Sequence, residues 1–193
     1  MKRKIGVLIS GNGSNLQSLI DACKKPDYPA EIHVVISNKD TAYGVNRASE
    51  AGIPAHILDH THYKSREEFD KAMHEMLERH NVEIVCLAGF MRLLSPWFIK
   101  QWQGKILNVH PSLLPEFKGS HAVRDALKAG VKETGCTVHR VIDEVDAGEI
   151  ILQARVPVKV GDTEETLLER IHLQEHRIYP EALKMVIGQL AAM

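Results

Sequence analysis

The sequence predicts an α/β fold with a Rossmann-like, mostly parallel sheet and helices on both faces. Short apolar runs rich in Val and Ile alternate with longer amphipathic segments through the first two-thirds of the chain. Near-continuous apolar strands separated by helices are typical of a parallel sheet that is buried on both faces. A second observation is that the residue pattern changes near residue 134, where β-rich segments are followed by one long helical stretch.

Five segments of the first part have the composition of strands. In chain order they are KIGVLIS, EIHVVIS, the weaker IPAHIL, VEIVCLAG and KILNVH. Helices are expected over residues 14–24, 42–51 and 65–80. The third begins with Ser65 and has Glu68 three residues later, which is a capping box. Its apolar residues follow helical spacing, at Phe69, Met73, Met76 and Leu77.

The last third predicts two further strands and a long helix. GCTVHRVI and EIILQARVPV are strand candidates joined by the turn DEVDAGE. The helix is expected from about Thr163 to Ile187, and Pro180 inside it could start a new turn. No internal repeat, low-complexity segment or linker interrupts the chain, so we expect one domain over residues 1–193.

Composition limits the class of protein. Apolar residues make up 44% and charged residues 25% of the 193 residues, the balance of a globular protein in water. The formal charge is −1, so no overall field attracts nucleic acid or an anionic membrane. Three widely spaced cysteines without a CxxC pair fit a reducing compartment, and no signal peptide or membrane-crossing span is apparent. We expect a cytoplasmic protein without nucleic-acid or membrane partners.

The segment SGNGSNL, residues 10–16, follows the first strand and opens the first helix. Gly11 and Gly13 would let backbone N–H groups face an anion, and the helix N-terminus adds a favourable dipole. The segment matches neither GxGxxG nor GxxxxGK(S/T). The alternative is an ordinary tight turn capped by Ser14 or Asn15. Its position after the first strand of this fold class favours phosphate binding.

Asn108 and His110 end the strand candidate KILNVH and precede PSLLP. Residues two apart on a strand point to the same side, and strand ends open into the ligand crevice of such sheets. Asn supplies a neutral N–H donor, and His can give or take a proton near neutral pH. Either residue alone is more often structural. As a pair, they could stabilise oxyanion charge on a carbonyl under attack.

The turn DEVDAGEI contains three acids, Asp143, Glu144 and Asp146. A carboxylate beside the imidazole of His110 would favour its protonated form and fix its tautomer. The sequence alone does not choose among the three, although Asp146, directly before Ala-Gly, is in the tightest position. No GxSxG motif and no Cys-His nucleophile pair is present, so the chemistry resembles direct transfer without a covalent intermediate.

Histidines elsewhere offer a competing metal hypothesis. HLQEH, from His172 to His176, matches the HxxEH pattern of a zinc protease class, and histidines four apart share a helix face. A zinc site would explain neither the Asn108–His110 pair nor the glycine loop, so we expect no metal. The segment HILDHTH, with three more histidines, is interpreted as a solvated loop.

The chain resembles glycinamide ribonucleotide transformylase, the folate-dependent phosphoribosylglycinamide formyltransferase family of purine synthesis. The resemblance covers essentially all residues and rests on five motifs in the family's order: ISGNGSNLQSLI, LAGFMRLLSPWF, ILNVHPSLLP, VDAGEIILQARVPV and QEHRIYP. It implies the formyltransferase fold and transfer of the formyl group of 10-formyltetrahydrofolate, a co-substrate, to the amine of glycinamide ribonucleotide, without a metal. It also implies a nucleotide- and phosphate-binding half over about 1–110, and a half over about 111–193 with the folate site and C-terminal helix.

The resemblance implies roles for individual residues. Asn108 and protonated His110 would stabilise the oxygen of the tetrahedral intermediate, and Asp146 would keep His110 protonated. Proton loss from the attacking amine would involve Asp146 or a bound water. The ribonucleotide would be bound by Asn12, Gly13, Ser14, Asn15, His172 and Glu175. The folate would be bound by Arg66, Met91, Arg92, Leu93, Leu94, Asn108, Ile142, Asp143, Glu144, Val145 and Asp146.

Without the resemblance, the stripe FMRLL would be interpreted as plain core. One position departs from the family pattern, because Val123 stands where many members have a second histidine after His121. Any role of an imidazole at that position is therefore in doubt in this chain.

Three other functions compete with the transferase. A 10-formyltetrahydrofolate hydrolase would share the catalytic trio, but that family carries an N-terminal regulatory domain. A methionyl-tRNA formyltransferase needs a further C-terminal domain and a basic tRNA surface. A non-catalytic nucleotide-binding module would need neither an acid nor an oxyanion clamp. We expect small-molecule substrates as the only ligands, and a monomer or homodimer.

Overall fold

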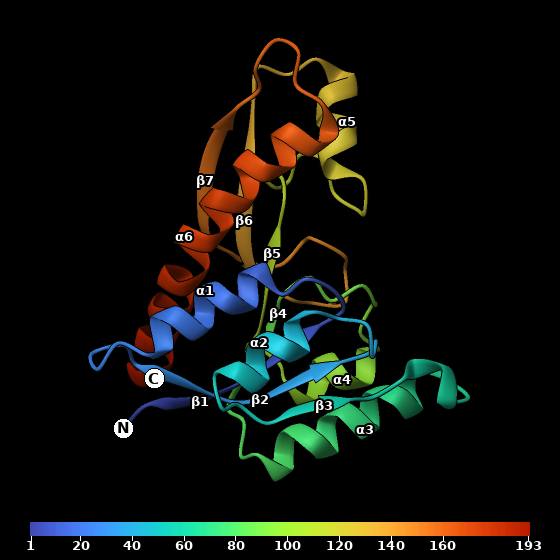
Figure 1. Ribbon diagram of the computed structural model, residues 1–193, viewed down its shortest axis with the longest axis vertical. Coiled ribbons are helices and arrows are strands. Elements are labelled where there is room, and N and C mark those ends of the chain that lie inside the picture. The colour runs from blue at the N-terminus through green and yellow to red at the C-terminus, as the bar shows by residue number, and fades with distance from the viewer. The chain divides into compact units, whose positions relative to one another are not determined.

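The computed structural model describes all 193 residues, and the chain divides into two units, Met1–Leu107 and Asn108–Met193 (Figure 1). The boundary falls inside strand β5 (Ile106–His110). The sequence led us to expect a single domain. That the two units fold together as one domain stays a prediction. No helix in the chain is both long and apolar enough to cross a membrane.

The first unit is built on four parallel strands. In sheet order they are β3 (Ala55–Ile57), β2 (Ala30–Ser37), β1 (Arg3–Ile9) and β4 (Ile84–Leu87). The register places Val7 of β1 opposite Val35 of β2 and Cys86 of β4. All three side chains are fully buried. The apolar runs of the sequence are therefore strands buried on both faces, as predicted.

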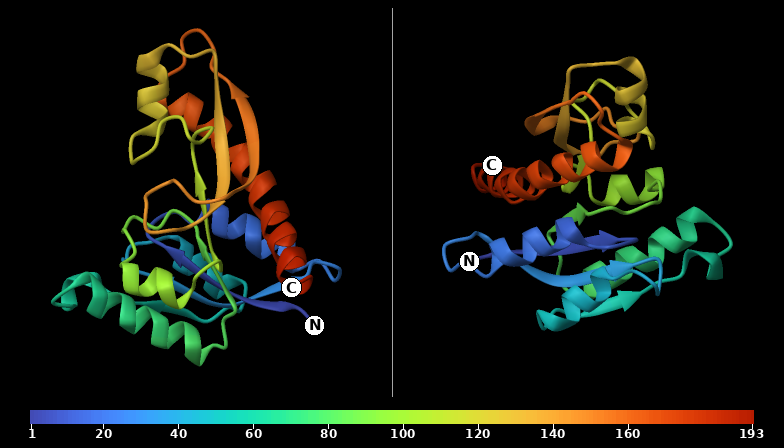
Figure 2. Two further views of the ribbon diagram at one scale, coloured as in Figure 1. Left: turned by 180° about the vertical axis from the view of Figure 1, so that it is seen from behind. Right: turned by 45° about the horizontal axis from the view of Figure 1, so that its top comes forward.

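Helices cover both faces of this sheet. α1 (Ser14–Cys23) packs beside α2 (Gly44–Glu50), and α3 (Arg66–Arg79) packs beside α4 (Pro96–Gln101). Because crossovers between parallel strands are right-handed, the two pairs lie on opposite faces. The left view of Figure 2 shows α3 and α4 in front of the strands. A 3₁₀ turn, η1 (His60–His62), precedes α3.

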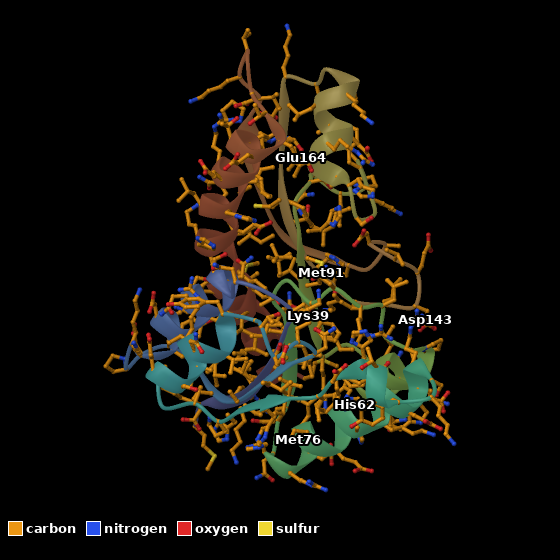
Figure 3. All side chains as sticks on the ribbon, turned by 45° about the vertical axis from the view of Figure 1, so that its right-hand side comes forward. Lys39, His62, Met76, Met91, Asp143 and Glu164 are labelled. Atoms are coloured by element: carbon orange, nitrogen blue, oxygen red, sulfur yellow. The ribbon has the colours of Figure 1, made fainter.

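The start of α3 follows the sequence signal only in part. Ser65 Oγ accepts a hydrogen bond from the Glu68 backbone N–H at 3.1 Å, as a capping box requires. The return bond is different, because Glu68 Oε2 accepts from the N–H of Lys64 rather than Ser65. The predicted apolar stripe is buried at three positions, Phe69, Met73 and Leu77, and half-buried at the fourth, Met76 (Figure 3).

The segment HILDHTH is not simply a solvated loop, which corrects the sequence interpretation. His56 lies on β3, and its Nε2 is 3.2 Å from Nε2 of His80. His60 Nδ1 lies 3.3 Å from the side-chain nitrogen of Asn38. Only His62, labelled in Figure 3, is largely exposed, at 77% of its side chain. Period-two patterns are too short here to show which imidazoles pack inward.

The second unit contains an antiparallel pair, β6 (Glu133–Arg140) and β7 (Ile150–Pro157). The long helix α6 (Glu164–Ala191) packs against this pair, and α5 (Ala122–Ala129) contacts α6 (Figure 1). A Cβ added to Gly135 would overlap the carbonyl oxygen of Ala154 on β7. Glycine at this position therefore permits the close approach of β6 and β7.

α6 runs without a break past Pro180, so no new helix begins there. At its start, Thr163 Oγ1 accepts from the Thr166 N–H at 3.2 Å, and Thr166 Oγ1 accepts from the Thr163 N–H at 2.9 Å. The buried face includes Leu167, Ile171, Ile178, Leu183 and Val186. Helices α4 and α5 were not predicted, because six and eight residues are too few to show a helical period.

The three cysteines form no disulfide and lie at different depths. Cys86 on β4 and Cys136 on β6 are fully buried, and Cys23 at the end of α1 is half-buried. Burial raises the pKa of the Cys136 thiol to about 12. Burial also raises the pKa of Cys23 to about 11, against a smaller lowering by Lys2.

Candidate active site

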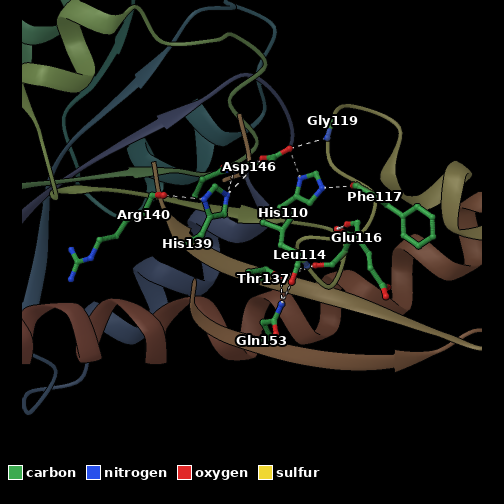
Figure 4. Close-up of polar contacts among 12 residues, drawn as sticks. His110, Leu114, Glu116, Phe117, Gly119, Thr137, His139, Arg140, Asp146 and Gln153 are labelled. Carbon is green, nitrogen blue, oxygen red and sulfur yellow. Dashed lines mark hydrogen bonds and ion pairs between the residues drawn. The ribbon is translucent and has the colours of Figure 1, made fainter. Parts of the chain in front are cut away.

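Asn108 and His110 lie two residues apart at the end of β5, so their side chains leave the same side of the strand. His110 is only 6% exposed, whereas Asn108 is half-buried. An imidazole and an amide at a strand end contribute little to packing. Their placement calls for polar partners, and these partners lie in the same unit, Asn108–Met193 (Figure 4).

His110 is held between two acceptors. Its Nε2 lies 2.8 Å from the Phe117 carbonyl oxygen, and its Nδ1 lies 3.6 Å from Oδ2 of Asp146. A carbonyl oxygen can only accept, so Nε2–H donates to Phe117. The same Asp146 Oδ2 accepts from the Gly119 N–H at 2.9 Å. Each ring nitrogen therefore faces an acceptor oxygen, an arrangement that accommodates a proton on both.

The structure brings one of the three candidate acids to the imidazole. The side chain of Asp146 is 9% exposed, whereas Asp143 and Glu144 are exposed residues of the same turn. Figure 3 labels Asp143 on that turn, and Figure 4 shows Asp146 directed toward His110. Asp146 has a left-handed backbone with φ of 54°, which Asp adopts more readily than most residues.

A second histidine, which the sequence analysis did not single out, completes the cluster. His139 on β6 has its Nε2 3.3 Å from the side-chain nitrogen of Asn108 and 3.8 Å from Oδ1 of Asp146. Its Nδ1 lies 3.1 Å from the carbonyl oxygen of Arg140. Burial lowers the pKa of His139, although the Arg140 carbonyl and Asp146 act in the opposite direction.

The tautomer of His139 follows from these contacts. Nδ1 carries the proton, because the Arg140 carbonyl only accepts. In the neutral ring Nε2 is then an acceptor, and it takes one N–H of the Asn108 amide. Asn108 is thereby oriented with its nitrogen toward the cluster. In the sequence, the only signal for His139 was its place within the strand segment TVHRVI. Such a place is equally typical of a structural histidine.

The turn that carries Asp146 is closed at its base. The Arg140 N–H donates to the Glu149 carbonyl oxygen at 2.9 Å, and Arg140 Nε donates to Glu149 Oε2 at 2.7 Å. Arg140 Nη2 also donates to Gln189 of α6 at 2.6 Å. A Cβ on Gly148 would overlap the Arg140 carbonyl oxygen. These contacts fix both ends of the turn, which limits the positions that Asp146 can adopt.

Chemically, this cluster joins an amide donor, an imidazole and a buried carboxylate. An amide N–H and a protonated imidazole can donate to an oxygen that gains negative charge, which is how enzymes stabilise tetrahedral intermediates. The imidazole can also pass a proton to a leaving group. These residues include no hydroxyl or thiol that could act as a nucleophile, and direct transfer stays a prediction.

The glycine loop belongs to the first unit. Gly13 has a φ of 78° and stands at the N-cap of α1, with no side-chain cap, so neither Ser14 nor Asn15 caps the helix. A Cβ on Gly13 would lie 2.7 Å from Cα of Gly44 in α2. A glycine N-cap leaves the start of the helix open to an anion.

The base of the glycine loop is fixed by a short polar network. Ser10 Oγ donates to Asn38 Oδ1 at 2.6 Å and accepts from the Met91 N–H at 2.8 Å. This hydroxyl therefore joins the ends of β1 and β2 to the segment after β4. These two bonds anchor the residue at which the glycine loop begins.

Comparisons with known proteins decide the family. The model of the family described as formyl transferase matches residues 3–183. The chain belongs to the formyl transferase family. It is 49% identical to the phosphoribosylglycinamide formyltransferase of Escherichia coli strain K12, over 91% of this chain and 83% of that protein.

Two further comparisons refine the likeness. The chain is 57% identical to the trifunctional purine biosynthetic protein adenosine-3 of Gallus gallus, over 96% of this chain, but it spans only 18% of that protein's length. The crystal structure of glycinamide ribonucleotide transformylase 1 from Symbiobacterium toebii matches with a TM-score of 0.95 at 50% identity, covering 97% of this chain and 89% of that one. The fold is therefore the mostly parallel α/β fold of these transferases.

In this member of the formyl transferase family, the FMRLL stripe is only partly core. Met91, labelled in Figure 3, is 74% exposed and Leu93 is 55% exposed, whereas Leu94 is buried. The guanidinium of Arg92 lies 5.5 Å from the centre of the Phe69 ring. Arg66 is exposed in the first turn of α3. Met91 and Leu93 are exposed apolar side chains that a flat apolar ligand could cover.

Other predicted contact residues of this chain lie in the second unit. Glu175 of α6 is 4% exposed, and its Oε2 is 4.0 Å from Nε2 of His172. Burial lowers the pKa of His172. The rings of His172 and His176 stack at 6.2 Å. No group of three or more His, Cys, Asp or Glu side chains could hold a metal ion, HLQEH included.

The remaining positions that the sequence analysis named lie on the Asp146 turn and on α5. Ile142 and Val145 are exposed at 44% and 47%, on the same turn as Asp146. Val123, where the resemblance implies a second histidine in many members, is 6% exposed in α5. Its side chain is buried and contributes to packing. Val123 cannot supply an imidazole to the site.

Proposed function

We propose that this chain transfers the formyl group of 10-formyltetrahydrofolate to the amino group of glycinamide ribonucleotide, a step of de novo purine biosynthesis. The observation that carries the proposal is the contact of His110 with Asp146, beside Asn108, in a member of the formyl transferase family. The names of the relatives support the acceptor, since the Escherichia coli protein is a phosphoribosylglycinamide formyltransferase. The cytoplasm is the expected location, and a monomer or homodimer the expected state.

In the proposed reaction, the amine nitrogen of the ribonucleotide attacks the formyl carbon. A new C–N bond forms, and the formyl oxygen takes negative charge that N–H donors of Asn108 and His110 stabilise. For His110, this step requires that Nε2–H leave the Phe117 carbonyl oxygen, while Nδ1 keeps facing Asp146. The bond from the formyl carbon to the folate nitrogen then breaks. The amine loses one proton and the folate nitrogen gains one, so His110 acts as the acid while Asp146 or a bound water takes the amine proton.

The substrate sites are also proposals. Asn12, Gly13, Ser14 and Asn15 would hold the phosphate, with backbone N–H groups at the start of α1 facing its oxygens. His172 and Glu175 would contact the glycinamide end. The folate would lie against the exposed apolar side chains of Met91 and Leu93, with the turn 142–146 near its pterin. No metal is part of this proposal.

The proposal is tested by mixing the protein with 10-formyltetrahydrofolate and following the folate product with and without glycinamide ribonucleotide. We expect product only when the ribonucleotide is present. Equal product without it would show a hydrolase, and would contradict the assignment of the glycine loop to the acceptor phosphate. No product in either mixture, with both ligands still bound, would instead indicate a non-catalytic binding protein.

A further inference from the structure

Arg47 of α2 bonds to the glycine loop, although nothing in the sequence analysis singled it out. Its Nε donates to the backbone carbonyl oxygen of Asn12 at 2.9 Å, and its Nη2 donates to Asn12 Oδ1 at 2.8 Å. Its Nη1 also donates to Gln17 Oε1 at 3.4 Å. One guanidinium therefore holds both the backbone and the side chain of Asn12.

These contacts determine which face of the Asn12 amide is presented to a ligand. Asn12 lies outside regular structure and is exposed, so its side chain would otherwise change rotamer freely. Because Oδ1 accepts from Arg47, the amide nitrogen and its two N–H donors point away from the guanidinium. An anion needs donors, and Arg47 therefore selects the orientation that can bind one.

The position of Arg47 is itself fixed by backbone packing. The Gly44 N–H donates to the Gly11 carbonyl oxygen at 3.1 Å, and a Cβ on Gly13 would lie only 2.7 Å from the Cα of Gly44. The centre of the Tyr43 ring is 5.0 Å from Cζ of Arg47. The start of α2 is thus held on the loop, with Arg47 one turn later.

The contacts with Asn12 depend on the planar, forked geometry of the arginine guanidinium. Nε and Nη2 bond to two oxygens of the same residue, in the manner of a bidentate pair, and a lysine ammonium could not reach both in one plane. The three acceptors are neutral oxygens, so the positive charge is not cancelled by these bonds. Two effects, positioning and charge, can therefore be separated by substitution.

We propose that Arg47 is a positioning residue for phosphate binding: it holds Asn12 with its amide N–H groups toward the phosphate of the acceptor substrate. The inference rests on the proposed function, in which residues 12–15 bind that phosphate. Arg47 acts through Asn12 and takes no part in the chemical step. Its loss is expected to weaken binding of the phosphorylated acceptor and to leave the folate and the formyl-transfer step unchanged.

The test compares Arg47→Lys, which keeps the charge, with wild type on two acceptors, glycinamide ribonucleotide and the glycinamide riboside that lacks the phosphate. We expect kcat/KM for the ribonucleotide to fall about tenfold in Arg47→Lys through KM, with kcat and the folate KM unchanged. For the riboside, the variant and wild type should be equal. Arg79→Lys, at an exposed position in the last turn of α3, is the matched control.

Each contrary result has a separate meaning. If Arg47→Lys matches wild type on the ribonucleotide while Arg47→Met does not, charge alone acts and the positioning role is overturned. If kcat/KM of Arg47→Lys falls equally for both acceptors, Arg47 has only a structural role. If wild type itself does not distinguish ribonucleotide from riboside, the phosphate site in the proposed function fails instead. The double variant of Arg47→Lys and Asn12→Ala should lose no more kcat/KM for the ribonucleotide than the more affected single variant, because the two residues act together.

Discussion

Two residues that contact His110 have a left-handed backbone. Phe117 has a φ of 51° and Asp146 a φ of 54°, a conformation that costs non-glycine residues on the order of 1–3 kcal/mol. Phe117 presents its carbonyl oxygen to one side of the ring, and Asp146 presents its carboxylate to the other. Only one other non-glycine residue in the chain, Asn81, has a positive φ. Because two of the three such residues contact His110, we infer that these segments are shaped around its ring.

The role of the acid is tested by Asp146→Asn. The amide keeps the size of the side chain but removes the charge facing His110, so kcat/KM for formyl transfer should fall by about 10²–10⁴. Asp27→Asn, at an exposed position between α1 and β2 and outside the proposed site, is the control and should keep nearly all activity. An equal loss in Asp27→Asn would show that the loss does not come from the contact with His110.

His139 gives a prediction about pH and stability. Burial lowers its pKa below the ordinary 6.5, so between that lowered value and about 6.5 the unfolded chain binds more protons than the folded one. Stability from this group is therefore present above pH 6.5 and decreases as the pH falls through that range. His139→Gln can keep both hydrogen bonds without titrating. Its free energy of unfolding in urea should fall less than that of wild type between pH 7.5 and 5.5; parallel curves would contradict the assignment.

At the scale of elements, α6 depends on its N-terminal cap and on the face that it buries. Thr163 and Thr166 exchange hydrogen bonds across the first turn, and Arg170 Nη2 bonds to Asp162 at 2.8 Å just before the helix. Further along, the same helix holds Glu175 and packs on β6, which carries His139. The cap therefore supports an element on which two candidate site residues depend.

The cap is tested by Thr163→Ala, with Thr163→Ser as the matched control. Alanine removes the side-chain acceptor for the Thr166 N–H and should lower the free energy of unfolding by about 1 kcal/mol, whereas serine keeps the acceptor. Urea denaturation of both variants measures the difference. Comparable losses would show that methyl packing of Thr163, rather than the hydrogen bond, stabilises the start of α6.

For the whole molecule, the sequence predicts some features much better than others. Apolar runs such as KIGVLIS predict strands correctly, because burial on both faces leaves an unbroken pattern. The spacing of Asn108 and His110 predicts that they share a side, because strand geometry is local. The residues alone did not choose Asp146 over Asp143, although the resemblance implied Asp146, because the contact with His110 depends on the left-handed turn at 146. His139 and Arg47 contact residues 31 and 35 positions away, and no local pattern encodes such contacts.

The two buried cysteines have a consequence for how the molecule opens. Cys86 lies in the core of the first unit and Cys136 in the core of the second, and both are inaccessible in the folded chain. Alkylation requires an exposed thiolate, so iodoacetamide can modify either one only after its own unit unfolds. Mass spectrometry of the two peptides, at rising urea, would report each unit separately. Equal protection of both thiols is expected if the chain is one cooperative domain; earlier labelling of one would reveal a partly unfolded intermediate.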